Sequence, residues 1–440
     1  MLVHDTIAAL STPPGEGAIA VVRVSGPDIR SIAAKIFLGP PLTPRAAVFG
    51  RIVNAAGPVD DVVVTWFQGP ASYTGEDVLE ISCHGGVLIS ASVLETVLAA
   101  GARAAGPGEF TQRAFLNGKM DLTQAEAVMD LIRAQTPLAA RAAAEQLRGR
   151  IGSEISAIRD ALLDIVAHVE AYIDFPDEDI DPDTDAALRS RIEDVRRRIG
   201  ALLATAEEGR VLREGVRLAI CGRPNAGKSS LLNRLLGFER AIVSPTPGTT
   251  RDTVEDVASL RGIPFRLIDT AGLRETPDAI EREGVRRARE AVERADVIVH
   301  LVDATAAGDA GEPVAKNEIV VFNKIDLLPD DERGVVPQDA PAISCATGEG
   351  IEALIDVIVS RVRREPEGGT TNLAAINARH QACLIRADAA LGEALERFQE
   401  APEFVAVHLR AAMDAVGEVT GVVDTEDILG RIFGTFCIGK

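Results

Sequence analysis

Basic residues, paired cysteines and long apolar runs are all scarce in this chain of 440 residues. Lysine and arginine total 46 against 66 aspartate and glutamate residues, and the resulting net charge of −20 argues against broad wrapping of nucleic acid, since phosphate contacts need basic side chains. The five cysteines form no Cys-x-x-Cys pair, which argues against structural zinc and against a disulfide framework. No segment is apolar for the length of a membrane-spanning helix. The N-terminus has neither the basic stretch nor the long apolar stretch of an export signal. We therefore expect a cytoplasmic protein with reduced thiols and no membrane contact.

Two arginine clusters, at 189–198 and 282–289, are the exceptions to this shortage of positive charge. We interpret both as solvated helix faces paired with neighbouring acids. Any contact with nucleic acid should then be limited, or shared with a partner.

What the chain does have is a series of five short motifs between Val216 and Cys345, in the order that a guanine-nucleotide switch requires. They are Gly222 to Ser230, Thr249 to Asp252, Asp269 to Gly272, Asn323 to Asp326, and Ser344 with Cys345. Each motif alone could be an ordinary turn. Together they favour GTP binding and hydrolysis.

The first motif predicts a phosphate-binding loop. The apolar run 216–220 reads as a buried strand, and a helix should follow with Leu231, Leu232, Leu235 and Leu236 on its buried side. In such a loop, backbone N–H groups surround the phosphates, the Lys228 ammonium neutralises them and the Ser229 hydroxyl binds magnesium.

Base choice is assigned to Asn323, Lys324 and Asp326, which follow the apolar strand 319–322. The Asp326 carboxylate can accept from the ring N–H and from the exocyclic amine of guanine. Adenine offers neither donor at those places, so the carboxylate would lose its partners. GTP is therefore expected over ATP. Ser344 should support the base, with Cys345 where alanine is usual.

The switch motifs complete the nucleotide site. Asp269 ends the strand 265–268 and should hold magnesium through water, Thr250 should be the second magnesium ligand, and Gly272 should sense the γ-phosphate. Leu273 stands where many small GTPases have glutamine, so catalysis must recruit another group. The predicted GTP-binding residues are Asn225, Ala226, Gly227, Lys228, Ser229, Ser230, Ser244, Thr249, Thr250, Asp269, Thr270, Ala271, Gly272, Asn323, Lys324, Asp326 and Ser344.

Composition along the chain predicts a multidomain α/β and α+β protein. Residues 1–118 should form an N-terminal α+β domain, with strands at 19–24 and 62–66 and a helix at 90–100. Helical pattern then begins behind an expected capping box of Thr123 and Glu126. We predict a discontinuous helical domain at 119–209 and 371–440, interrupted by a Ras-like P-loop GTPase domain at 210–370. Two separate helical bundles are the alternative.

Further motifs are spread over the whole chain. They are Asp5 to Ala8, Thr12 to Gly15, Ser72 to Asp77, His84 to Gly86, Pro107 to Thr111, and Phe436 to Lys440. With the GTPase series between them, the chain resembles the MnmE (TrmE) family of tRNA modification GTPases.

This resemblance implies that a potassium ion takes the place of an arginine finger. Asn225, Ser244, Thr246 and Thr249 match the positions that hold it, and amide and carbonyl oxygens suit such an ion. Glu281 matches the catalytic glutamate that orients the attacking water, a task that Leu273 cannot perform.

The resemblance also implies a folate site and a partner. Arg23, Glu80, Lys119 and Lys440 match positions that contact a formyl-tetrahydrofolate, with the 5-formyl form as ligand or analogue, and Cys437 is the candidate reactive thiol on a flexible tail. The family forms homodimers through its N-terminal domain. It modifies carbon 5 of the wobble uridine of certain tRNAs with the FAD-dependent MnmG (GidA), in a heterotetramer or larger complex, adding an aminomethyl or carboxymethylaminomethyl group.

A switch acting in ribosome assembly or regulation is the alternative function. It would need neither the folate positions nor Cys437, and no RNA-binding module follows the GTPase segment.

Overall fold

In the computed structural model of the chain, the described residues are 5–174, 185–238, 256–269, 293–309, 317–329, 336–337, 339–362, 376–398, 402–422 and 426–440. They fall into two compact units. Unit 1 comprises Met1–Met129, Leu147–Ile192 and Ala389–Lys440, and unit 2 comprises Asp130–Gln146 and Glu193–Asp388.

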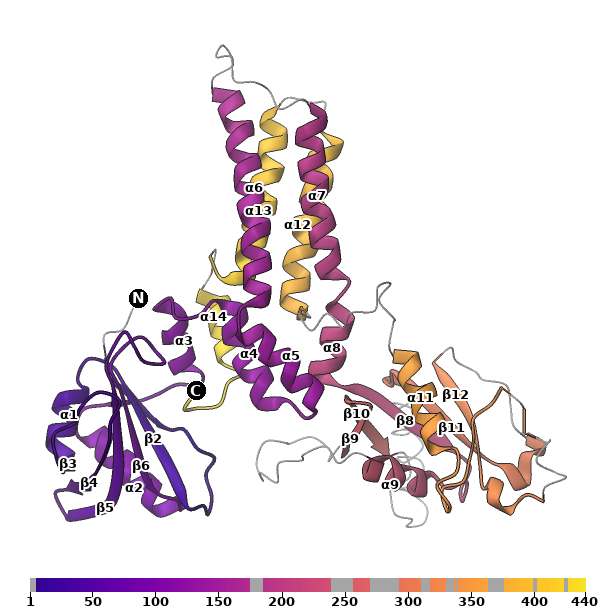
Figure 1. Cartoon of the computed structure of the whole chain (residues 1–440), viewed down its shortest axis with the longest axis horizontal. Helices are drawn as coiled ribbons and strands as arrows, with labels where there is room; N and C mark the ends of the chain where they lie inside the picture. The colour runs from indigo at the N-terminus through magenta and orange to yellow at the C-terminus, as the bar shows by residue number, and fades with distance from the viewer. Residues whose placement is uncertain are drawn as a thin grey trace, which may run out of the picture. The chain divides into compact units, whose positions relative to one another are not determined.

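The N-terminal part of unit 1 is a seven-stranded sheet in the order β3-β4-β5-β6-β2-β1-β7. Figure 1 labels β2 to β6 of this sheet. Its strands are β1 (Ile7–Leu10), β2 (Ile19–Ser25), β3 (Phe37–Leu38), β4 (Ala47–Asn54), β5 (Gly57–Phe67), β6 (Val78–His84) and β7 (Arg103–Ala104). Helices α1 (Ile29–Ile36) and α2 (Val87–Ala99) pack on it and share its apolar core. In α1 the buried side chains recur at Ile29, Ile32, Ala33 and Ile36, the spacing of one helix face. The expected strands and helix of this α+β part are confirmed.

Helices make up the rest of unit 1, and three of them are shared with unit 2. They are α3 (Glu109–Leu116), α4 (Leu122–Arg133), α6 (Arg150–Asp174), α7 (Asp185–Leu203), α12 (Ala378–Glu396), α13 (Pro402–Thr420) and α14 (Glu426–Phe433). Apolar side chains recur at helical spacing from Ile155 to Val169 and form one buried face of α6, and α6 packs along α13. Because these two helices lie on opposite sides of the GTPase segment in sequence, one interrupted helical domain is favoured over two bundles. The predicted domain boundaries remain predictions.

The start of α4 differs from the expected capping box. The side chain of Asp121, not of Thr123, accepts from the backbone N–H of Gln124 at 2.9 Å, and Gln124 Oε1 accepts from the Asp121 N–H at 3.0 Å. The Thr123 hydroxyl donates to the same Asp121 carboxylate. The box is therefore Asp121 with Gln124, since a carboxylate accepts more strongly than a hydroxyl and Thr123 is buried.

Unit 2 contains a six-stranded sheet in the order β13-β12-β11-β8-β10-β9, in which only β9 runs antiparallel. Its strands are β8 (Val216–Gly222), β9 (Asp256–Leu260), β10 (Ile263–Asp269), β11 (Val297–Asp303), β12 (Glu318–Asn323) and β13 (Ala342–Ile343). The helical elements are α5 (Pro137–Leu147), α8 (Ala206–Glu214), α9 (Lys228–Phe238), η1 (Ala304–Asp309), η2 (Ile325–Leu327) and α11 (Ile351–Val362). Leu231 and Leu235 of α9 are buried in its core, as predicted. The α/β GTPase fold expected from the sequence is confirmed.

The first arginine cluster lies on α7 and is paired with acids. Arg196 contacts Asp388 at 2.9 Å and Arg197 contacts Asp194 at 2.7 Å. This supports the solvated-face interpretation. The second cluster lies outside the described residues.

Candidate functional site

The parallel strands of unit 2 bring the described nucleotide motifs to one edge of the sheet. β8 aligns Ile220 with Asp269 of β10, and β11 aligns Asp303 with Asn323 of β12. All four strands therefore end at this edge, where the phosphate loop, Asp269 and the 323–326 segment follow. Ligands of open α/β sheets bind at the carboxyl ends of the strands.

The phosphate loop places polar groups on its open side. Asn225 has a left-handed backbone (φ 63°), and its side chain is exposed, as are those of Ser229 and Ser230. The Lys228 ammonium donates to the carbonyl oxygens of Gly222 (2.9 Å) and Arg223 (3.0 Å), so a positive charge stays within the loop. Since α9 begins at Lys228, the unpaired N–H groups of its first turn add an anion site.

Asn323 is a structural bridge between two motifs. Its side chain is 2% exposed, donates to the Ala226 carbonyl at 2.8 Å and accepts from the Cys345 N–H at 3.0 Å. Arg234 of α9 adds a second link by donating to the carbonyls of Cys345 and Ala346. The phosphate loop and the Ser344 segment are thus held in one register by side chains.

The segment predicted to recognise the base has one exposed acid and one fixed lysine. The Asp326 carboxylate is exposed, while Lys324, in a left-handed conformation (φ 69°), pairs with Asp303 at 2.6 Å. Burial alone would raise the pKa of Asp303, but Lys324 and Thr305 outweigh it and lower that pKa. Ser344 is fully buried, and burial raises the pKa of the neighbouring Cys345 thiol to about 11, so this thiol stays neutral.

Several predicted residues fall outside this description. Ser244, Thr246, Thr249, Thr250, Thr270, Ala271, Gly272 and Glu281 lie outside the described residues, and of Asp269 only the backbone position is given. Within the described ranges no three His, Cys, Asp or Glu side chains are grouped to hold a metal ion.

A second constellation lies in unit 1, on the sheet of the N-terminal part. Arg23 of β2 and Glu80 of β6 are direct cross-strand neighbours, and Arg23 Nη2 donates to Glu80 Oε1 at 2.8 Å. The guanidinium also lies over the rings of Tyr73 (5.4 Å) and Phe110 (5.8 Å). Lys119 is placed differently, since its ammonium donates to the Pro70 carbonyl.

The C-terminal segment joins this constellation. Burial and the charge of Arg23 lower the pKa of Lys440, while the charges of Glu80 and Cys437 oppose this shift. Phe110 links the two segments, since its N–H donates to the Lys440 carbonyl and its ring lies 5.8 Å from the Arg23 guanidinium. Cys437 is exposed. The tail, expected to be flexible, is hydrogen-bonded to the start of α3, with the Gly108 N–H donating to the Cys437 carbonyl and the Phe110 N–H to the Lys440 carbonyl.

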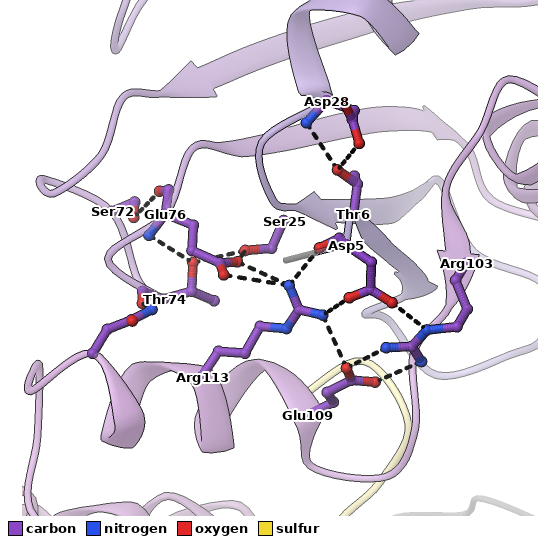
Figure 2. A network of polar contacts seen from close by, with 11 residues as sticks. Asp5, Thr6, Ser25, Asp28, Ser72, Thr74, Glu76, Arg103, Glu109 and Arg113 are labelled. Atoms are coloured by element: carbon purple, nitrogen blue, oxygen red, sulfur yellow. Dashed lines mark hydrogen bonds and ion pairs between the residues drawn. The ribbon is translucent and has the colours of Figure 1, made fainter. Parts of the chain in front are cut away.

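A buried polar network supports the same region (Figure 2). Arg113 of α3, 6% exposed, donates to Asp5 (2.6 Å), Glu109 (3.0 Å) and Glu76 (3.2 Å). Figure 2 shows three separated motifs meeting at this one guanidinium. These motifs therefore fix the loop that carries Tyr73 and the helix that carries Phe110.

The sequence-based prediction missed Arg113, Asp303 and Arg234. The spacing of four between Glu109 and Arg113 on one helix was an available signal. Asp303 ends an apolar run that was not singled out, and nothing in the sequence near Arg234 points to the Cys345 carbonyl.

Comparison with known proteins gives matches over nearly the whole length. Residues 6–119 match the family described as GTP-binding protein TrmE N-terminus, and residues 122–437 match the MnmE helical domain. The chain is similar to the tRNA modification GTPase MnmE of Akkermansia muciniphila, with 50% identity over 99% of both chains. It is also similar to those of Roseiflexus sp. (45%) and Clostridioides difficile (40%), each over 100% of both chains. Among the described helices, none combines the length and the apolarity needed to cross a membrane.

Proposed function

The chain belongs to the MnmE (TrmE) family of tRNA modification GTPases, and from this we propose that its GTP hydrolysis is potassium-activated and drives modification of carbon 5 of the wobble uridine in certain tRNAs. An aminomethyl or carboxymethylaminomethyl group would be installed, with a folate as the one-carbon source. GTP hydrolysis would supply conformational change, not carbon chemistry.

In the GTPase site each described side chain has a task that fits its position. Lys228 and the first turn of α9 bind the phosphates, and the exposed Asp326 carboxylate selects guanine. The Ser229 hydroxyl is a hard oxygen donor that suits magnesium, with Thr250 as the second ligand and Asp269 acting through water. Asp269, Thr270, Ala271 and Gly272 would line the γ-phosphate, and Glu281 would orient the attacking water.

The exposed side chain of Asn225 is the described part of the proposed potassium site. Its amide oxygen, with Ser244, Thr246 and Thr249, would offer neutral oxygen ligands. A potassium ion held there supplies positive charge where the transition state gains negative charge.

In unit 1 the convergence of Arg23, Glu80, Cys437 and Lys440 carries the folate part of the proposal. Arginine and lysine side chains, here with Lys119 added, pair with the carboxylates of a folate tail, and a glutamate accepts from pterin N–H groups. Cys437 is exposed beside them and is the candidate reactive thiol.

We further propose a homodimer that works in the cytoplasm with the flavoprotein MnmG (GidA) in a heterotetramer or larger complex. The domains would be 1–118 for folate binding and dimerisation, 119–209 with 371–440 for the helical domain, and 210–370 for the GTPase.

The first test is the GTP hydrolysis rate in potassium buffer against sodium buffer of equal ionic strength. We expect strong stimulation by potassium in the wild-type chain and its loss in Asn225→Ala, with GTP binding retained because Lys228 and Asp326 remain. Equal rates of the wild type in the two salts would contradict the potassium site and point to an external activating protein.

A second test separates the modification enzyme from a regulatory switch. Nucleoside analysis of tRNA from a deletion strain should show wobble uridines without the carbon-5 group. Unchanged wobble uridines in that strain would overturn the modification role and leave the GTPase assignment standing.

A further inference from the structure

The segment Phe436–Lys440 is held between two parts of the N-terminal fold. On one side the Gly108 and Phe110 N–H groups donate to the carbonyls of Cys437 (3.4 Å) and Lys440 (3.2 Å), and Pro107 pairs with Ile438 as an antiparallel bridge. On the other side the Ser11 hydroxyl donates to the Gly439 carbonyl at 3.0 Å. The backbone of the tail is thus fixed from both directions.

Two glycines permit this close approach. Gly439 has φ 98° and is buried, and a Cβ there would collide with the Leu10 carbonyl oxygen and lie 3.0 Å from Ser11 Cα. Gly108 has φ 64°, and a Cβ there would lie 2.8 Å from the Phe433 carbonyl oxygen. Both glycines therefore meet backbone atoms, which cannot rotate away as the end of a side chain can.

The fixed backbone determines where two reactive side chains lie. Lys440 follows Gly439 directly, and Cys437 precedes Gly439 by two residues. Phe110, whose N–H donates to the Lys440 carbonyl, has its ring 5.8 Å from the Arg23 guanidinium, and that guanidinium pairs with Glu80. A change in the path at Gly439 would move the ammonium away from the Arg23–Glu80 pair. The tail has no partner on the Ser11 side other than that hydroxyl among the hydrogen bonds of the described residues.

We infer that Ser11, Gly108 and Gly439 form a backbone clamp and act as positioning residues, which set Lys440 and Cys437 against the Arg23–Glu80 pair for folate binding. This clamp rests on the proposed folate site. It assigns a role to residues outside the ligand set: Gly108 of the Pro107–Thr111 motif, and Ser11, which directly precedes Thr12–Gly15.

The experiment uses the full-length chain with Gly439→Ala, Ser11→Ala and Ser11→Thr. Gly430→Ala is the matched control, since it lies in α14, nine residues before Gly439, and its added Cβ meets open space. Two readouts are measured on each protein: hydrogen–deuterium exchange of peptides covering residues 106–112, and the dissociation constant for 5-formyl-tetrahydrofolate by titration calorimetry. Thermal unfolding and GTP hydrolysis check that each variant is folded.

Gly439→Ala should accelerate exchange at the Gly108 and Phe110 amides and weaken folate binding by about tenfold or more, because backbone strain or release of the tail must follow. Ser11→Ala should weaken folate binding by about two- to tenfold, the loss of one hydrogen bond. Ser11→Thr keeps the hydroxyl and should restore binding, and Gly430→Ala should match the wild type in both readouts.

Unchanged amide exchange in Gly439→Ala would overturn the clamp. Faster exchange with unchanged folate affinity would overturn its positioning role. If Gly439→Ala does not fold, the difference in folate affinity between Ser11→Ala and Ser11→Thr decides whether the clamp positions the tail. A wild-type chain that binds no folate would instead overturn the folate part of the proposed function, and exchange alone would then decide whether the clamp exists.

Discussion

At the scale of single residues, one buried guanidinium holds three of the N-terminal motifs together. Arg113 joins Asp5, Glu76 and Glu109, and Arg103 adds a second cation to Asp5 and Glu109. The planar guanidinium of Arg113 holds its N–H donors in a rigid fork that points to several carboxylates, whereas a lysine would offer a single charge with three donors on a flexible stem. The side chains of the proposed folate site therefore depend on residues outside that site.

Arg113→Met should lower the free energy of unfolding by about 2–4 kcal/mol. Removing the cation leaves Glu76 without an ion-pair partner among the described residues and leaves Asp5 and Glu109 with Arg103 alone. The cost stays below that of a fully buried pair because the carboxylates retain some exposure. Chemical denaturation at neutral pH measures it. The control is Arg51→Met, whose partner Asp61 is exposed, so that this variant should lose far less stability than Arg113→Met. Equal losses in the two variants would contradict the network.

The same network predicts how the free energy of unfolding changes at acidic pH. The Arg103 hydrogen bond, ahead of Arg113, lowers the pKa of Asp5, and at Glu109 the two arginines outweigh the opposing effect of burial. Stability from lowered carboxyl pKa values is complete above the ordinary value of about 4 and is lost as pH falls through the lowered values. The gap between wild type and Arg113→Met should therefore narrow below about pH 4, as measured by denaturation at a series of pH values.

At the scale of elements, one arginine joins the helices next to the two places where the chain enters and leaves the GTPase segment. Arg213, at the end of α8, donates to Asp130 of α4 (2.7 Å), Gln146 of α5 (3.0 Å) and the Ile376 carbonyl (2.9 Å). Ile376 lies just before α12, and β8 begins three residues after Arg213. The entry and exit of the inserted segment are therefore tied to the same helices.

Arg213→Ala should destabilise unit 2 by about 2–4 kcal/mol, since its partners are mostly buried and would be left unsatisfied. Arg210→Ala is the matched control on the same helix. Arg210 pairs with Glu207 and Asp296 near the surface, so its loss should cost less than about 1 kcal/mol. Chemical denaturation in the absence and in the presence of GTP would measure the loss of stability in both variants. A larger loss in Arg210→Ala than in Arg213→Ala would contradict the role assigned to Arg213.

At the scale of the whole molecule, charge limits how tRNA can be held. The chain carries −20 net charges, and arginines of the cluster on α7 that could have met phosphates pair instead with Asp388 and Asp194. Recognition of tRNA must then depend on few phosphate contacts or on the proposed flavoprotein partner.

The salt dependence of tRNA binding tests this limit. A plot of log Kd against log salt concentration for the chain alone should have a slope corresponding to fewer than about five phosphates, at roughly 0.7–0.9 per contact. Adding the partner should steepen the slope. A steep slope for the chain alone would mean that a basic surface forms in solution.

The sequence by itself determined the GTPase core, because its motifs sit at the ends of apolar strands whose period and length identify them. The predicted strands at 216–220, 265–268 and 319–322 are present, and the loops that follow them in the described residues meet at one edge. The burial of α6 on one face also followed from its helical period. Local patterns suffice where a residue's role depends on its own element.

Only the tertiary structure determined which distant segments contact one another. The bridge of Asn323 to Cys345, the meeting of Asp5, Glu76 and Glu109 at Arg113, and the docking of Gly439 against Leu10 join residues far apart in the chain. No periodicity encodes such contacts, since they depend on how the elements pack. The capping box moved from Thr123 to Asp121 for a related reason: Thr123 is buried in the packed fold, which sequence spacing does not reveal.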